Sequence, residues 1–462
     1  MPPQSSPLPT PTILLPGLPP KTLVGIDLLS FTSTANFHGI RDLPEGWHFL
    51  YTGTTESFSL RCGGWFYIGD IQSATTTGAA STALTRRRLG GADATEIRVW
   101  KWNQDVEALV PIIGESSEEK QEAMRYKANL SAIWQSGGLF RYRSRISSTA
   151  AGGREEDRDL DDEDNQKEGR SDWVGLTGNI SPQLLSRILG DPEVDVDGKP
   201  RWTVTSGSTA QRDADQIPGL TSREAAGITA EQEKDLRFLP VDLKRTWREG
   251  AIGRERTEAA QDRSWALGDL VRRVAQDGDE QMGERQVLGE LQFTFLMVLT
   301  LMNYSCLEQW KRLLSLIFTC RAAVTAREGF FTDVLRLLRL QLKRCDDVEG
   351  GLFEMDGENG AEFLIKLLTG FKRTVDELSD GVGFAVKFEL KVFEKWVKEE
   401  FNWELKKEAI VKRGMLELED GERVEMEMND ADEEDETGEY APVIVDLGER
   451  EGSSSLELDM KD

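Results

Sequence analysis

The sequence predicts an α+β multidomain protein, with a β-rich N-terminal domain, an all-α helical C-terminal domain and a disordered acidic tail. Short β-favouring segments separated by Pro/Gly turns fill the first part of the chain. From about Thr257 to Lys407, apolar residues instead recur with the 3.6-residue period of helices. Residues 411–462 hold 19 acidic and 5 basic side chains, so they bury too little apolar surface to fold alone.

These changes of pattern set the expected domain boundaries. A Thr/Ala/Gly-rich stretch and a strongly acidic stretch are expected to be disordered inserts in the β-rich domain. The predicted parts are the β-rich domain at 12–210 with inserts near 69–95 and 144–170, a linker at 211–235, the helical domain at 236–410 and the tail at 411–462 with a strand-forming segment at 441–447.

The β-rich domain is expected to contain strands rich in β-branched and aromatic residues. The predicted strands are Thr12–Leu15, Leu23–Asp27, Trp47–Thr52, Phe58–Ile68 and Glu96–Trp102, the last with two tryptophans on one face. Two short helices are predicted from the capping residues at their starts. Serine precedes acidic residues at the start of Ser117–Trp134, and Ser181-Pro182 starts a helix through Leu189. Residues from Gly190 to about Lys234 show little pattern.

The helical domain is expected to form an antiparallel bundle or a solenoid-like stack. Its predicted helices are Thr257–Val274, Glu284–Leu301, Cys306–Thr325, Phe330–Arg344, Ala361–Leu378 and Phe384–Glu404. Trp310 and Leu314 lie four residues apart on one apolar stripe, so both should be buried. The apolar run from Phe293 to Met302 is too short to span a bilayer and is expected to be a buried helix.

Motifs that carry chemistry are scarce, so we expect no catalysis, no cofactor and no metal site. The chain has two histidines, His38 and His48, which leaves few options for a triad and none for a multi-histidine metal site. His48 has apolar neighbours in a predicted strand, which favours a hydrogen-bonded core histidine over a catalytic one. A phosphate loop is missing, and four widely spaced cysteines form no CxxC pair, as suits a reducing compartment.

The charge of the chain favours protein partners over nucleic acid. The formal net charge is −26, and nucleic-acid affinity comes largely from Lys and Arg neutralising phosphates. We therefore expect no tight direct RNA binding and a partner with a basic face. The Pro/Ser-rich start lacks the pattern of a signal peptide, so the chain is expected in the cytoplasm, the nucleus or both, without membrane contact. It is also expected to be a monomer.

The most informative candidate site is an apolar island in the acidic tail. Its residues are Ala441, Pro442, Val443, Ile444, Val445, Asp446 and Leu447. Three consecutive β-branched residues favour a strand, and strand addition to an exposed sheet edge is a known mode of peptide binding. The island either joins a partner's sheet or returns to an edge of this protein's own sheet.

A second candidate lies where the two predicted domains join. Arg245, Trp247 and Arg248 belong to a polar, glycine-punctuated stretch, and Arg/Trp-rich joints have the composition of interaction hot spots. The competing interpretation is structural, because the stretch leads into a helix expected to start at Thr257.

Several stretches in the right order resemble the a-one cistron splicing factor (Aar-two) family. They are LLPGLPPKTLVGIDLLSFTSTANFHGI and LPEGWHFLYTG near the start, IRVWKW at 97–102, DWVGLTGNIS at 172–181, REGAIGRERTEAAQDRSWAL at 248–267, ELQFTFLMVLTLMNYSCLEQWKRLLSLIF at 290–318 and APVIVDL at 441–447. The inserts at 69–95 and 144–170 and the long acidic spacer at 411–439 depart from the family pattern and resemble loop expansions.

The resemblance implies a non-enzymatic assembly factor of the spliceosomal U5 snRNP. It implies binding to the large U5 scaffold protein (Prp-eight type) at its RNase H-like and Jab/MPN-like domains, in competition with the Brr-two type helicase. It also implies that the tail, at Ala441–Leu447 here, adds a strand to that partner. Two alternatives stay open: a general acidic chaperone for basic proteins, and a small-molecule enzyme built on the β-rich domain.

Overall fold

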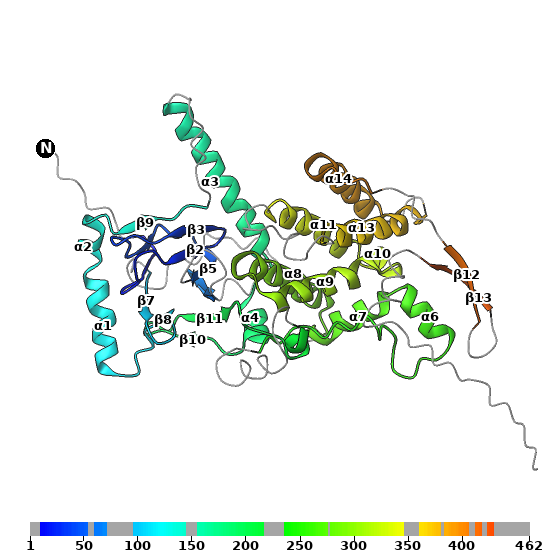
Figure 1. The fold of residues 1–462 in the computed structure, drawn as a ribbon, viewed down its shortest axis with the longest axis horizontal. Helices are drawn as coiled ribbons and strands as arrows, with labels where there is room; N and C mark the ends of the chain where they lie inside the picture. Colours follow the sequence, from blue (N-terminus) through cyan, green and yellow to red (C-terminus); the bar gives the residue numbers. More distant parts are fainter. Residues whose placement is uncertain are drawn as a thin grey trace, which may run out of the picture. The chain divides into compact units, whose positions relative to one another are not determined.

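The computed structural model describes most of the chain. The described ranges are 10–53, 60–71, 96–144, 155–216, 235–275, 278–345, 360–379, 383–405, 412–417 and 423–428. The chain divides into two compact units, Met1–Leu405 and Lys406–Asp462. The first unit contains a β-rich N-terminal part and a helical C-terminal part, which confirms the predicted fold class (Figure 1).

Two sheets form the β-rich part. The first is a mixed sheet whose strands, in spatial order, are β8 (Ala108–Pro111), β7 (Ile97–Asn103), β1 (Thr12–Leu14), β4 (Gly39–Arg41) and β9 (Leu139–Arg141). The second is antiparallel and contains, in spatial order, β10 (Glu193–Val194), β11 (Pro200–Thr205), β6 (Arg61–Ile68), β5 (Gly46–Gly53), β2 (Leu23–Ile26) and β3 (Leu29–Thr32).

The two sheets pack face to face, and helices cover their outer faces. Phe66 of β6 and Trp100 of β7 meet edge to face across the inter-sheet core, with ring centroids 5.1 Å apart. The helices α1 (Ser117–Ala128) and α2 (Leu130–Gln135) cover the outer face of the mixed sheet through Ala123 and Leu130. On the outer face of the antiparallel sheet, Gly63 leaves room for the ring of Phe49, because a Cβ at this position would lie 2.3 Å from that ring.

The helical part packs against that second outer face. Its helices are α6 (Arg254–Gln261), α7 (Ser264–Val274), α8 (Glu280–Leu301), α9 (Tyr304–Phe318), α10 (Ala322–Ala326), α11 (Glu328–Leu342), α13 (Gly360–Asp376) and α14 (Phe384–Phe401). The central α8 is buried at every position from Gln286 to Leu301, as the apolar run predicted. Trp310 and Leu314 are also buried, as predicted.

One hydrophobic core joins the β-rich and helical parts. It runs from Trp47 to Leu405 in sequence and includes side chains from the antiparallel sheet and from the helices. Trp65 of β6 stacks on Trp173 at a centroid distance of 6.0 Å and lies 6.3 Å from the ring of Phe293 on α8. The two predicted domains therefore share a core within one compact unit.

The acidic insert predicted at 144–170 requires a correction. Residues 155–170 of this insert belong to a long helix, α3 (Glu155–Thr177), where the sequence predicted disorder. Its last turns bury Trp173 and Leu176 in the shared core, and the indole of Trp173 donates a 2.7 Å hydrogen bond to the carbonyl of Trp47. Docking of this apolar end stabilises a helix that its acidic composition alone would not form.

Several other segments gain structure that the sequence did not predict. In the poorly patterned region after Gly190, β10 and β11 extend the antiparallel sheet, and α4 (Pro182–Leu189) precedes them with Ser181 as its cap, as expected. Residues at the start of the predicted linker 211–235 form a 3-10 helix, η2 (Gln211–Gln216), and Asp213 is buried against Arg312. Within the second unit, β12 (Lys412–Glu417) and β13 (Arg423–Met428) pair as an antiparallel hairpin in the predicted acidic spacer.

Candidate protein-interaction site

The two sequence-predicted sites have different outcomes. The island at 441–447, with Pro442, Val443, Ile444, Val445 and Asp446 between its ends, lies outside the described residues, so its strand addition stays a prediction. The joint containing Arg245, Trp247 and Arg248 is described in full, and it forms a tight loop before α6.

The loop is fixed from the inside by a buried threonine. Thr246 is 1 % exposed, and its hydroxyl donates a 2.7 Å hydrogen bond to the carbonyl of Ala259 on α6. Asp242 accepts from the backbone amide of Arg245 at 3.1 Å, which closes the start of the loop. The helix begins at Arg254, earlier than the expected Thr257, after Gly253 in a positive-φ conformation.

The three candidate side chains of the loop divide between structural and exposed roles. Trp247 is half-buried, and the guanidinium carbon of Arg256 on α6 lies 5.6 Å from its ring centroid, a cation–π contact between the loop and the helix. Arg248 is exposed and forms a 2.9 Å ion pair with Glu255, which is worth little at the surface. Arg245 is also exposed, and so is Ile252, which is 72 % exposed. The structure thus supports a structural role for Trp247 and leaves the two arginines at the surface.

The one sequence-predicted candidate for catalysis is held in the core. His48 is 1 % exposed, with Nδ1 2.8 Å from Oδ2 of Asp27 and Nε2 2.8 Å from the carbonyl oxygen of Pro44. Since a carbonyl oxygen can only accept, Nε2 carries a proton and donates to it. The phenol of Tyr142 also donates to Asp27, at 2.7 Å, and burial together with Asp27 raises the pKa of this tyrosine well above its ordinary value. His48 is therefore a hydrogen-bonded core histidine, as predicted.

Other buried polar groups also cross-link the fold. Glu290 on α8 is fully buried and accepts from Arg187 of α4 at 2.6 Å and from the backbone amide of Leu239 at 2.9 Å. Gln309 of α9 adds a third donor at 2.7 Å. Among the described residues, no group of three or more His, Cys, Asp or Glu side chains is placed to hold a metal ion. No helix within the described ranges is both long and apolar enough to cross a bilayer.

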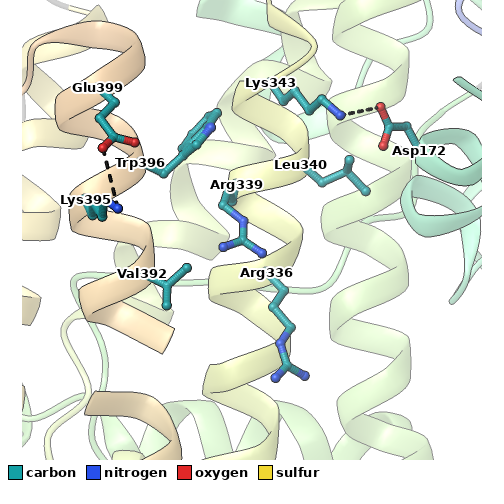
Figure 2. Close-up of a pocket in the computed structure, with 9 residues that line it drawn as sticks. All are labelled: Asp172, Arg336, Arg339, Leu340, Lys343, Val392, Lys395, Trp396 and Glu399. Carbon is teal, nitrogen blue, oxygen red and sulfur yellow. Dashed lines mark hydrogen bonds and ion pairs between the residues drawn. The ribbon is translucent and has the colours of Figure 1, made fainter. Parts of the chain in front are cut away.

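A surface that sequence reasoning missed lies between α11 and α14. A groove of about 590 Å³ there is lined by Arg336, Arg339, Leu340, Lys343, Val392, Lys395, Trp396, Glu399 and, from α3, Asp172 (Figure 2). Its signal was present in the sequence, because apolar residues of α14 occupy two separate stripes and only one of them can face the bundle core.

The fold is that of an α+β protein. The buried polar groups described above bond to one another within the fold, and the groove between α11 and α14 lies at the surface. Comparison with known families identifies it further. Residues 9–190 match the AAR2 N-terminal domain, and residues 238–406 match the AAR2 C-terminal repeat region. The chain belongs to the AAR2 family, which makes it an AAR2-type factor of splicing and snRNP assembly.

Curated relatives agree with this assignment. Proteins named "Protein AAR2 homolog" from Macaca fascicularis and Homo sapiens are each 24 % identical to this chain over 346 residues. The one from Mus musculus is 24 % identical over 343 residues. Each alignment covers 72 % of this chain and 75 % of the relative, so the likeness extends across both the β-rich and the helical parts.

Proposed function

We propose that this chain is a non-enzymatic factor that assists U5 snRNP assembly by binding the large U5 scaffold protein at its RNase H-like and Jab/MPN-like domains. Bound there, it blocks premature binding of the Brr-two type helicase. The observation that carries the proposal is membership of the AAR2 family across residues 9–190 and 238–406, together with the strand-forming island at 441–447 that follows them.

The chemistry of the island gives the binding mode. In a strand, side chains alternate between faces, so Val443, Val445 and Leu447 would point one way and Ile444 the other. Pro442 has no amide hydrogen and so belongs at the start of the added strand, where no ladder bond is needed. Acidic neighbours of the island steer it towards a basic edge and discourage self-pairing.

The setting of this activity follows from the same proposal. The factor acts as a monomer, in the cytoplasm and the nucleus, and contacts protein and not RNA or membrane. The net charge of −26 supports the choice of protein, since it opposes contact with phosphates. The structural engagement of both ring nitrogens of His48 supports a role without catalysis over the β-domain enzyme considered above.

The test compares two single substitutions in the full-length chain. Ile444→Pro removes a backbone donor from the middle of the added strand, whereas Asp446→Asn removes charge alone. Affinity for the isolated RNase H-like and Jab/MPN-like domains, measured by calorimetry, should fall strongly for Ile444→Pro. For Asp446→Asn the main effect, seen by surface plasmon resonance, should be slower association.

Two outcomes would contradict the proposal. Unchanged affinity of Ile444→Pro for the scaffold domains would show that the tail adds no strand. Salt-sensitive binding to many basic proteins such as histones, unaffected by loss of residues 443–445, would instead identify a general acidic chaperone.

A further inference from the structure

Helix α14 carries a second apolar stripe, which is exposed at the start of the helix and half-buried towards its end. Its first stripe, Val386, Leu390, Phe393 and Val397, is buried in the bundle. The second consists of Phe384, Phe388, Val392 and Trp396, which recur every four residues; the first two are exposed, the last two are half-buried, and Trp396 packs against the edge of the core. Phe384 is 76 % exposed and Phe388 59 % exposed. At 1.5 Å per residue the row is about 18 Å long, a contiguous apolar surface of the kind that marks interaction sites.

A basic row on the neighbouring helix runs beside this apolar stripe. Arg336 and Arg339 on α11 and Lys343 at its C-cap follow one another at spacings of three and four residues. Figure 2 shows Arg336 and Arg339 on the helix beside Val392 and Trp396, whereas Lys343 reaches to Asp172 on α3; residue numbers rise in the same direction along both helices. The groove therefore has an aliphatic and aromatic wall on α14 and a cationic wall on α11.

The cationic wall keeps donors available to a ligand. Glu389 lies beneath it with its side chain 7 % exposed, 3.0 Å from Arg336 and 3.5 Å from Arg339, so two guanidiniums share this one buried carboxylate. The Arg336 side chain is 58 % exposed, and a guanidinium has five N–H donors, more than its acidic neighbours can occupy. Lys343 pairs with Glu168 and Asp172, and Lys395 lies 3.8 Å from Glu399, so these two lysines are largely neutralised. Arg336 and Arg339, which share Glu389, are therefore the cations of the groove that a ligand can engage.

The aromatic wall is held in place at its C-terminal end. The ring of Trp396 lies 6.3 Å from that of Phe393 in the core and 5.6 Å from that of Phe401, in an edge-to-face arrangement with the latter. An aromatic residue fixed in this way loses little conformational entropy when a partner covers it, which is the character of an interface anchor.

We propose that the groove between α11 and α14 binds an amphipathic helix of a partner protein, apolar along one stripe and acidic along its flank. The parallel apolar and basic rows follow two helix axes, which fits a helix laid into the groove, as in other helix-in-groove complexes. Its apolar residues cover Phe388, Val392 and Trp396, and its carboxylates pair with Arg336 and Arg339. A basic helix would meet the cationic wall with like charge and be rejected.

The test uses a designed peptide as the probe and the full-length chain as the receptor. The probe is an 18-residue fluorescein-labelled helix with leucines at i, i+4, i+8 and i+12 and glutamates on one flank. Its counterpart has the same leucines with lysines in place of the glutamates. Fluorescence anisotropy at low salt should show micromolar binding of the acidic probe, and binding of the lysine counterpart at least tenfold weaker.

Variants of the receptor locate the binding. Phe388→Ala and Arg336→Glu should each weaken binding of the acidic probe about tenfold or more. Phe140→Ala, at another exposed phenylalanine, and Arg272→Glu, at another exposed arginine, are matched controls that should leave it unchanged. Phe388 is 59 % exposed, so a thermal melt close to that of the parent chain should accompany its loss of binding, whereas Arg336→Glu also removes a partner of the buried Glu389 and should lower the melting temperature as well.

Three results would overturn the proposal. The first is equal binding of the acidic and basic probes, or no binding of either. The second is loss of binding in the control variants to the same degree as in the groove variants. The third is a concentration-dependent dimer in light scattering that Phe388→Ala abolishes, because the occupant of the groove would then be a second copy of the chain.

Discussion

The shared core predicts that the β-rich and helical parts unfold together. Phe293 of α8 is fully buried, and its ring lies 6.3 Å from that of Trp65 in β6, so it belongs to both parts at once. Replacing a buried phenylalanine by alanine typically costs about 3–5 kcal/mol, because transfer free energy is lost and a cavity is left. With a denaturant slope of about 3 kcal/mol per M, the urea midpoint of Phe293→Ala should fall by about 1–1.7 M.

Hydrogen exchange followed by mass spectrometry can test whether that loss is shared. Amides of β5 and β6 and amides of α9 should lose protection at the same urea concentration in Phe293→Ala, since both sets belong to one cooperative unit. Phe384→Ala is the matched control, because the same side chain is removed from a position that is 76 % exposed. The free energy of unfolding of this control should change by less than about 0.5 kcal/mol. Loss of protection in α9 alone, with β5 and β6 unchanged, would refute the shared core.

Two further predictions concern titratable side chains. Asp262 accepts from the backbone amides of Arg321 and Ala322 at 2.8 and 3.1 Å; burial alone would raise its pKa, but these amides and Ser264 lower it overall. A lowered pKa means that the stabilisation is present above about pH 4, the unfolded value, and is lost as the pH falls through the folded pKa. Asp262→Ala should cost about 1–2 kcal/mol at pH 7 in urea unfolding. A cost that stayed constant down to pH 3 would contradict this account. Burial also raises the pKa of the Cys306 and Cys320 thiols, whereas Cys62 is half-buried. A thiol reagent should therefore label Cys62 in the native protein and the other two after unfolding in urea, as mass spectrometry can check; early labelling of Cys306 would contradict the burial argument.

The elements predicted correctly are those with strong local signals. Capping serines at 116 and 181 mark helix starts that the structure confirms, since both side chains accept from the amide three residues on. The apolar run of α8 was recognisable because nearly every position is buried, which leaves no polar face. Strands β10 and β11 were missed because their pairing is non-local. Trp202 of β11 pairs with Trp65, a partner more than a hundred residues earlier, and no local pattern encodes that.

The candidate site shows the same division between local and tertiary information. The island at 441–447 is visible in sequence because β-branched residues interrupt an acidic stretch. The stripe of Phe384, Phe388, Val392 and Trp396 is equally regular, yet periodicity alone places it in the core with the rest of α14. Only the packing of α11 against α14 shows which of the two stripes remains outside.

Buried charges in this fold indicate where its specificity lies. Arg187 with Glu290, and Arg312 with Asp213, each pair a residue of the helical part with one from the preceding region. Such pairs recover little net free energy after desolvation, but breaking one is costly, so they favour one arrangement of the parts over others. Because these ionic groups are used inside the fold, we expect partners to bind where large apolar side chains are exposed at the surface. Exposed Phe384 and Phe388 beside the half-paired cations of α11 are such a surface, which is why we place a second partner there and not at the tightly closed loop of Arg245 and Arg248.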